Sequence, residues 1–274
     1  MRILLASPES HVWNSRAHIH MGLGYLPGSL LAAGYDDITL YDAAVETESI
    51  ADTLQRAIHQ GQPYHVVGIS SPTSLIKEAW EAAREAKAAG AITVLGGPHL
   101  TLMPDESILR SEVDLVVRGE AEDTVVEILR VLDTMNLRTA FSGSLYLPSA
   151  SWDEILGLSW RTESSLVIHN PPRPLREDLD SIPFPAHHLY KIEPYTNLQP
   201  LTDGLDPNAR AYTIVTSRGC PFTCTFCSKP ITGNTWRPRS VENIVDEWRW
   251  LVRDLHATEI GVTDDIWTRT WPTL

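Results

Sequence analysis

Residues 65–99 read HVVGISSPTSLIKEAWEAAREAKAAGAITVLGGPH, and this stretch predicts a complete strand–helix–strand unit. Its middle part, Ser74–Ala89, is rich in Ala, Glu, Lys and Arg, which favour helix, and Gly90 follows as a helix C-cap. The flanking runs, His65–Ser70 and Ile92–Leu95, are continuously apolar. Continuous apolar strands are typical of a parallel sheet, because helices cover both of its faces. The stretch therefore predicts an α/β fold.

The same alternation continues on both sides of this stretch. Three further strands are predicted, at Arg2–Ala6, Ile38–Tyr41 and Asp114–Val117. Four further helices are predicted, at Gly22–Ala33, Ile50–Gln60, Asp105–Leu109 and Ala121–Leu132. Repeated strand–helix units build a doubly wound parallel sheet of the flavodoxin or Rossmann type. We therefore expect one N-terminal domain of this type over residues 1–135.

Residues 136–210 differ in composition, because Pro, Ser and Asn become frequent there. Two short strands, Ile155–Arg161 and Ser165–His169, are predicted to form a small hairpin around Glu163–Ser164. The proline-rich run that follows can form neither a long helix nor a long strand. We therefore predict an ordered connector over residues 136–210 that lies against a domain on each side.

The strand-then-helix pattern resumes over residues 211–274. The predicted elements are a strand at Tyr212–Thr216, a helix near Val241–Leu255 and a strand at Glu259–Thr263. All the cysteines of the chain lie in this segment, within TSRGCPFTCTFC at residues 216–227. A disulfide framework would need an even number of cysteines spread along the chain. The clustering therefore indicates that the protein works in a reducing compartment and that the three thiols serve one local site.

Cys220, Cys224 and Cys227 have the spacing CxxxCxxC in a loop after a predicted strand. A 4Fe–4S cluster takes one thiolate for each iron, so three cysteines leave one iron open for a small-molecule ligand. Two alternatives compete with a cluster. A thioredoxin-like dithiol would leave Cys220 unused and lacks the helix start that such motifs favour. A structural zinc site would need a fourth ligand, and the nearest histidines are at no standard spacing.

The motif CxxxCxφC, with the aromatic Phe226 before the third cysteine, resembles the radical S-adenosylmethionine (SAM) superfamily. The segments WRPRS, ending at Ser240, and EIGVTDDIW, at residues 259–267, resemble the first repeat of its (β/α) barrel. The resemblance implies that the three cysteines ligate a 4Fe–4S cluster and that SAM is cleaved to a 5′-deoxyadenosyl radical. The backbone around Phe226 would meet the adenine of SAM. Asp264 and Asp265 would lie at the end of the second barrel strand. The alternative is that this pair of acids simply faces solvent at the strand end.

Loops rich in glycine and small residues follow three of the predicted N-terminal strands. In an open parallel sheet, ligands bind beyond the carboxyl ends of the strands, and small residues let a large planar ligand approach the backbone. Ordinary turn chemistry is the alternative for each loop taken alone. The candidate ligand-binding residues are Ser70, Ser71, Pro72, Thr73, Gly96, Gly97, Pro98, His99, Arg118, Gly119 and Glu120.

Taken together, LGYLPGSLLAAGY (23–35), VLGGPHLTLMP (94–104) and DLVVRGEAEDTVVEIL (114–129) resemble the cobalamin-binding domain of one large class of radical SAM proteins. This is the class B, methyltransferase-like class, in which the cobalamin-binding domain precedes the barrel. The proline-rich connector is similar to that class as well. The resemblance implies that cobalamin lies against the candidate loops, between the two domains.

The sequence also bears on how cobalt would be held. The cobalt-ligating motif DxHxxG is absent, which implies base-off cobalamin without that histidine. His11, His18 and His20 lie in the long first loop and could approach the cobalt, although a loop histidine is more often simply solvated. A flavin or nucleotide site is the alternative for this domain, but neither GxGxxG nor a P-loop follows the first strand.

The resemblance implies an enzyme that uses a 4Fe–4S cluster, SAM and cobalamin for methyl transfer, or a related radical reaction, on an unactivated carbon. Its partners would be an unidentified small-molecule substrate and an external electron donor such as flavodoxin or ferredoxin. The formal net charge of −13 argues against a nucleic-acid partner. No apolar run approaches the roughly 18 residues of a membrane span, and no signal peptide is evident, so a cytoplasmic protein is expected.

Residues 211–274 correspond only to the N-terminal portion of a radical SAM barrel. We therefore expect an incomplete barrel with an open sheet edge and an exposed apolar face near Ile266–Leu274. Three hypotheses follow. The chain is a truncated enzyme that is weak or inactive alone, or half of a split enzyme whose partner chain completes the barrel, or a non-catalytic module that binds cobalamin and an iron–sulfur cluster.

Overall fold

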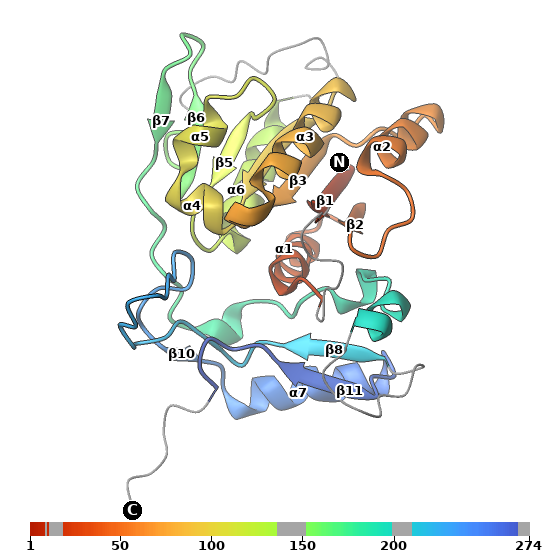
Figure 1. Ribbon diagram of the computed structural model, residues 1–274, viewed down its shortest axis with the longest axis vertical. Coiled ribbons are helices and arrows are strands. Elements are labelled where there is room, and N and C mark those ends of the chain that lie inside the picture. Colours follow the sequence, from red (N-terminus) through yellow and green to blue (C-terminus); the bar gives the residue numbers. More distant parts are fainter. Residues whose placement is uncertain (9, 11–18, 136–151, 199–209, 268–274) are drawn as a thin grey trace, which may run out of the picture.

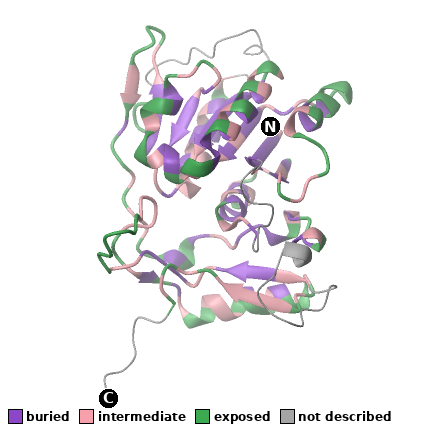
Figure 2. Cartoon of the chain, in the orientation of Figure 1, coloured by how far each residue is buried: buried purple, intermediate pink, exposed green. Residues whose placement is uncertain are grey.

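The computed structural model describes the chain except for residues 9, 11–18, 136–151, 199–209 and 268–274. Most of the described residues form one large sheet with helices on both faces, and the remainder form the connector and a smaller C-terminal unit (Figure 1). Buried residues concentrate in the strands of the large sheet and in the first strand of the C-terminal unit (Figure 2).

The large sheet has the strand order β2-β1-β3-β4-β5-β6-β7. The first five strands in chain order are β1 (Ile3–Ser7), β2 (Ile38–Asp42), β3 (Val66–Ser70), β4 (Ile92–Gly96) and β5 (Leu115–Val117). All their pairings with one another are parallel. The α/β fold class and the five predicted strands are therefore confirmed. Because β1 lies between β2 and β3, the order reverses at β1, which is the topological switch point of a doubly wound sheet.

Helices cover both faces of this sheet. Their bounds are α1 (Met21–Ala32), α2 (Ile50–His59), α3 (Ile76–Ala88), α4 (Pro98–Leu102), α5 (Pro104–Ile108) and α6 (Glu122–Thr134). One apolar core contains α2 and α3, and a second contains α1 and α6. The alanines of α3 lie at helical spacing and are buried, so that helix packs closely on the sheet. The sequence predicted every one of these helices except the short α4.

The predicted hairpin extends the same sheet rather than standing apart from it. It consists of β6 (Leu158–Arg161) and β7 (Val167–His169), which are antiparallel to their neighbours. β6 pairs with β5 and carries Trp160, which is 2% exposed and donates its indole N–H to Asn170 Oδ1 at 3.2 Å. The hairpin therefore covers the edge that the parallel part of the sheet would otherwise expose.

Replacing Trp160 by Ala is expected to lower the free energy of unfolding by about 3–5 kcal/mol, because it opens a large cavity in the core. Urea denaturation followed by circular dichroism measures the effect. Leu166→Ala, in the turn of the same hairpin, is the control, since Leu166 is 60% exposed. We expect a loss within about 0.5 kcal/mol for the control. Equal losses for the two variants would contradict the assignment of β6 to the core sheet.

The connector lies against both neighbouring units. At α1, Ala186 N donates to Gly24 O at 2.8 Å, and a Cβ on Gly28 would lie only 2.3 Å from Phe184 O. On the other side, His187 Nε2 lies 3.0 Å from Glu247 Oε1, and both side chains are fully buried. The described part of the connector therefore contacts the units on both sides.

The C-terminal unit is a parallel strand–helix–strand unit. It contains β8 (Ala211–Ile214), α7 (Val241–Arg253) and β11 (Glu259–Val262), and β8 pairs directly with β11. Between β8 and α7, the short strands β9 (Ser217–Arg218) and β10 (Arg237–Pro238) form an antiparallel ribbon. This ribbon brackets the three cysteines. The sequence predicted β8, α7 and β11, but it did not predict the β9–β10 ribbon.

Candidate cofactor site

A deep cleft lies at the carboxyl ends of the parallel strands, between α1, α6 and the C-terminal unit. It encloses about 1260 Å³ of empty space, part of which is open to solvent. The apolar part of its lining includes Leu5, Leu23, Leu30, Val66, Val94 and Leu129. Ligand pockets in proteins are mostly apolar and carry a few polar groups. The position and apolar lining of the cleft therefore suit a ligand with a large apolar part.

Glycines form the floor of the cleft at the ends of β4 and β5. Gly97 has φ +105°, and a Cβ there would lie 2.9 Å from both the backbone N and O of Ser71. Gly119, at φ +79°, also lines the cleft. A side chain at Gly97 would require the loop after β3 to move, so glycine is needed there both for the turn and for the space. The result is exposed backbone facing the cleft.

The structure brings some of the predicted ligand-binding residues to the cleft. Those that line it are Ser70, Gly96, Gly97, Gly119 and Glu120. The described lining does not include Ser71, Pro72, Thr73, Pro98, His99 or Arg118.

Two of these other residues turn away to make local contacts. The buried His99 ring has Nδ1 3.3 Å from Thr73 Oγ1 and Nε2 3.3 Å from Glu106 Oε2. Arg118 donates to the backbone oxygens of Leu158 and Asn170, which ties the end of β5 to the hairpin. Among the histidines proposed to approach cobalt, His20 caps α1, because its Nδ1 accepts from Leu23 N at 3.2 Å. His11 and His18 lie outside the described residues.

Much of the cleft wall was not predicted. α1 and α6 contribute Tyr25, Leu26 and Val125, among others, and the C-terminal unit contributes Ser217, Arg218, Thr232, Thr263 and Asp265. In the sequence, α6 has the apolar spacing of an ordinary core-facing helix and α1 is apolar on all sides, as in a buried helix, so neither gave a signal for a cavity. The residues from the C-terminal unit show that the cleft is shared between the sheet domain and the segment that carries the cysteines.

The cysteine loop is fixed at its base and exposed at its tip. Gly219 has φ +79°, and a Cβ there would lie 2.3 Å from Thr235 O. Lys229 Nζ donates to Cys220 O at 2.7 Å and also to Phe222 O. Cys220 is half-buried, whereas Cys224 and Cys227 are exposed. Phe226, between those two, is 92% exposed, so the loop presents thiols and an aromatic ring outward.

In the described part of the chain, no three His, Cys, Asp or Glu side chains are gathered so that they could hold a metal ion.

The paired acids after β11 have different roles. Asp264 accepts from Thr216 N at 2.7 Å and from Ser217 Oγ at 2.8 Å, so it joins the ends of β8 and β11. Asp265 accepts from Thr232 Oγ1 at 2.8 Å and lines the cleft. Asp264 is therefore a local backbone anchor, and Asp265 is a carboxylate that a ligand in the cleft could meet.

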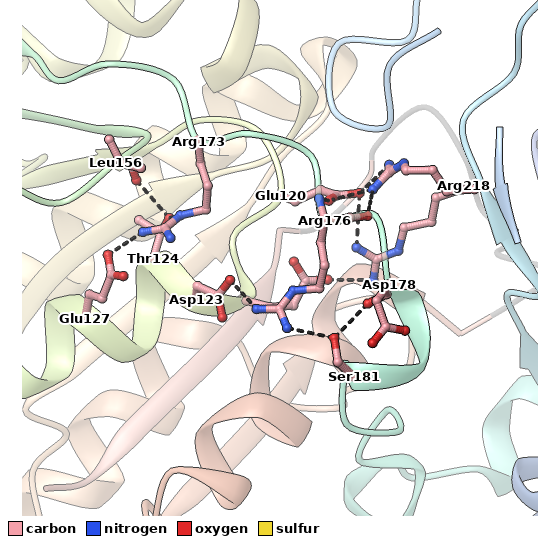
Figure 3. Close-up of polar contacts among 12 residues, drawn as sticks. Glu120, Asp123, Thr124, Glu127, Leu156, Arg173, Arg176, Asp178, Ser181 and Arg218 are labelled. Atoms are coloured by element: carbon pink, nitrogen blue, oxygen red, sulfur yellow. Dashed lines mark hydrogen bonds and ion pairs between the residues drawn. The ribbon is translucent and has the colours of Figure 1, made fainter. Parts of the chain in front are cut away.

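Ion pairs join the sheet domain to the connector and to the cysteine segment (Figure 3). Arg173 Nε donates to Thr124 Oγ1 at 2.8 Å, and Arg176 forms an ion pair with Asp123, both in the first turn of α6. Glu120 binds Arg218 and Arg237, which flank the cysteine loop. Arg218 also lies 4.7 Å above the ring of Tyr25. Burial is the main cause that raises the pKa of Tyr25 to about 12.

The electrostatics of Glu120 predict how stability depends on pH. Burial acts to raise its pKa, but the hydrogen bonds from Arg237 and the charges of Arg218 and Arg237 outweigh burial and hold the pKa below its usual value. A lowered pKa in the folded state contributes stability above the unfolded value near 4.5, and that contribution is lost as the pH falls through the folded pKa.

Glu120→Gln is therefore expected to lower the free energy of unfolding at pH 7 by about 3–5 kcal/mol, because it leaves buried arginine charge without its partner. The difference from the unmodified chain should shrink as the pH falls below about 4.5. Urea denaturation at a series of pH values measures both effects. A difference that stays constant into the acidic range would contradict an ionised, ion-paired Glu120.

None of the helices in the described residues has the length and apolar character needed to cross a membrane.

Comparisons with known proteins agree with these features. The B12 binding domain family matches residues 16–129. An uncharacterized methyltransferase of Pyrococcus horikoshii is 32% identical over 252 residues, which cover 90% of this chain and 49% of that protein. An anaerobic magnesium-protoporphyrin IX monomethyl ester cyclase of Rubrivivax gelatinosus is 30% identical over 259 residues, covering 92% of this chain and 43% of that protein. The chain thus spans about half the length of these relatives or less.

A solved structure shares the fold. The cobalamin-dependent S-adenosylmethionine radical enzyme OxsB, determined with aqua-cobalamin bound, superposes with a TM-score of 0.73 at 20% sequence identity. The match covers 97% of this chain and 34% of that one, so the sheet domain, the connector and the cysteine segment are all included.

Proposed function

Because this chain belongs to the cobalamin-binding-domain-containing radical SAM proteins, we propose that it binds cobalamin in the cleft and a 4Fe–4S cluster at Cys220, Cys224 and Cys227. With SAM, these cofactors would serve methyl transfer or a related radical reaction on an unactivated carbon. The observation that carries the proposal is the shared cleft. Its floor is the carboxyl edge of the sheet, and its opposite wall belongs to the segment that holds the cysteines.

The cleft fits cobalamin in two respects. The exposed backbone at Gly96, Gly97 and Gly119 would let a broad corrin ring lie flat against the loops. Behind these loops, the apolar side chains between α1 and α6 would receive the less polar part of a bound cobalamin.

The cysteine loop fits an iron–sulfur cluster by the chemistry of its donors. All three cysteines of the chain lie in this loop, and Cys224 and Cys227 are exposed, so that a cluster could be assembled on them. Phe226 is proposed to contribute the backbone that meets the adenine of SAM. Gly219 allows the sharp turn into Cys220, and backbone N–H groups of the loop would hydrogen-bond the cluster and tune its potential.

When bound, the cluster would supply one electron to SAM and cobalamin would supply a methyl group. The residues of this chain would bind, orient and enclose these groups. The apolar walls from α1 and α6 would exclude water from the cleft, and Asp265 would offer one fixed carboxylate next to the cysteine segment. Asp264 would keep the ends of β8 and β11 in register, so that the wall of the cleft from the C-terminal unit keeps its shape.

We propose that the electron comes from an external donor such as flavodoxin or ferredoxin, and that the chain acts in the reducing environment of the cytoplasm. The substrate is a small molecule.

Anaerobic reconstitution tests the proposal. Iron and sulfide should be taken up with the absorbance of a 4Fe–4S cluster, cobalamin should bind stoichiometrically, and SAM with a strong reductant should release 5′-deoxyadenosine. Cobalamin and cluster binding without release of 5′-deoxyadenosine would support the alternative of a non-catalytic binding module. Retention of zinc in place of iron would refute the radical SAM function.

A further inference from the structure

One carboxylate of the sheet domain binds both arginines that flank the cysteine loop. Arg218 and Arg237 are direct partners in the β9–β10 ribbon, so they close residues 219–236 into a loop. Glu120 Oε1 lies 2.7 Å from Arg237 Nη2 and 3.3 Å from Arg218 Nη1. Glu120 Oε2 lies 3.0 Å from Arg237 Nη1, which makes the contact with Arg237 bidentate.

These contacts are sheltered from water. The side chain of Glu120 is 6% exposed, that of Arg237 is 5% exposed and that of Arg218 is 10% exposed. Low exposure strengthens an ion pair, and a bidentate guanidinium–carboxylate contact fixes direction as well as distance. Glu122 Oε1 lies 2.6 Å from Arg218 Nη2, so two carboxylates balance two guanidinium groups. We call these four side chains the Glu120 clamp.

The clamp lies between the two halves of the cofactor site. Glu120 directly follows Gly119, which lines the cleft, and only Gly219 separates Arg218 from Cys220. Gly219 gives little freedom at this point, because its α-carbon lies tight against the opposite arm of the loop at Thr235 O. Cys220 N also faces Gly233 O, at 3.4 Å, across the same loop. A displacement of Arg218 would therefore move Cys220.

We infer that Glu120 is a positioning residue for the cysteine loop. Through Arg218 and Arg237 it holds the base of residues 219–236 at a fixed place beside the ligand loop of the sheet domain. Glu120 touches no thiol and acts only through the two arginines. That the loop holds a cluster rests on the proposed function, whereas the clamping of the loop by Glu120 does not.

Hydrogen–deuterium exchange on the full chain without cofactors tests the clamp directly. Glu120→Gln keeps the shape of the side chain and removes its charge. We expect exchange at residues 217–220 and 235–238 to become about tenfold faster or more, since breaking a buried ion pair from one side is strongly destabilising. Exchange in the β1 and β4 strands is followed in the same samples, because it reports the loss of global stability separately from the opening of the loop.

Asp114→Asn is the matched control. Asp114 is a partly buried carboxylate of the sheet domain, with 9% of its side chain exposed, and it lies 2.5 Å from Lys87 Nζ, but at the opposite end of β5. The Asp114→Asn substitution should leave hydrogen–deuterium exchange in the cysteine loop unchanged. If Glu120→Gln proves too unstable to isolate, Arg237→Lys removes the bidentate contact while it keeps the charge, and the same acceleration at 217–220 is expected. Unchanged exchange in the loop, or an equal acceleration in the control, would overturn the inference.

A second readout follows the cluster itself. After reconstitution, the electron paramagnetic resonance spectrum of the reduced cluster and its change on adding SAM should differ between Glu120→Gln and the unmodified chain. The Asp114→Asn chain should behave as the unmodified one. An identical spectrum and SAM response in Glu120→Gln would overturn the positioning role. Failure of the unmodified chain to take up any cluster would instead refute the proposed function, and the exchange experiment would still decide the clamp.

Discussion

Chains in which Cys220, Cys224 or Cys227 is replaced by Ser are expected to lose the iron–sulfur cluster. A serine hydroxyl remains protonated near neutral pH and is a poor ligand for iron, whereas a thiolate binds it strongly. Replacing a residue that only hydrogen-bonds to a metal ligand typically lowers metal affinity by about 10–100-fold. Loss of a direct ligand should lower it at least as much. Each single variant should therefore show iron, sulfide and brown colour near background after anaerobic reconstitution.

The measurement is iron and sulfide content per chain, with 5′-deoxyadenosine release from SAM as a second readout. Thr223→Ala is the control, because Thr223 is exposed on the same loop and is expected to carry no ligand. It should retain the cluster. Since the thiols of Cys224 and Cys227 are exposed and Cys220 is half-buried, loss of folding is not expected in the variants. Full iron content in any one of the serine variants would contradict a three-cysteine cluster.

Gly97→Ala is expected to abolish tight cobalamin binding. The φ angle of +105° would strain an alanine by about 1–3 kcal/mol. In addition, the new Cβ would lie 2.9 Å from two backbone atoms of Ser71, so the loop after β3 would have to move. Gly97 forms part of the floor of the cleft, and Ser70, which directly precedes Ser71, also lines it. Since each 1.4 kcal/mol is a factor of about ten in the dissociation constant, the expected loss is tenfold or more.

The absorbance change on titration with cobalamin measures this effect. Gly61→Ala is the matched control, because Gly61 also has a positive φ, of +70°, but has no atom within 4 Å of the added Cβ. The control should lose some stability and keep its affinity for cobalamin. If Gly97→Ala and Gly61→Ala bound cobalamin equally well, the cleft floor would not be the cobalamin site.

The parallel part of the fold was predictable because its signals are local. Each buried strand is a short apolar run, and helices such as α3 carry their own propensity and caps. The pairing of β6 with β5 was not predictable, because it depends on a contact between distant segments and not on the pattern within either. The β9–β10 ribbon was missed for a similar reason, since strands of two residues have no period to detect.

The cysteine motif of the candidate site could be read from the sequence, whereas the walls of the cleft were predicted only in part. The spacing of the cysteines is written directly in the sequence, and the glycines at strand ends follow from the sheet topology. A loop position does not fix the direction of a side chain, which is why His99 and Arg118 make local contacts instead of lining the cleft. The arginines that bind Glu120 lie about a hundred residues along the chain from it, so only the folded structure brings them together.

The contact of α1 with the connector has a consequence for how a bulky molecule reaches the interior. The helix and the connector meet through bare backbone at Gly28, are linked by the Ala186–Gly24 hydrogen bond, and are further joined where Tyr190 donates to His20 O at 2.6 Å. Because backbone and side-chain contacts join them closely, α1 and the connector are expected to move as one body. Entry of a ligand as large as a corrin thus requires either the solvent-facing mouth of the cleft or a hinge motion that carries both segments together.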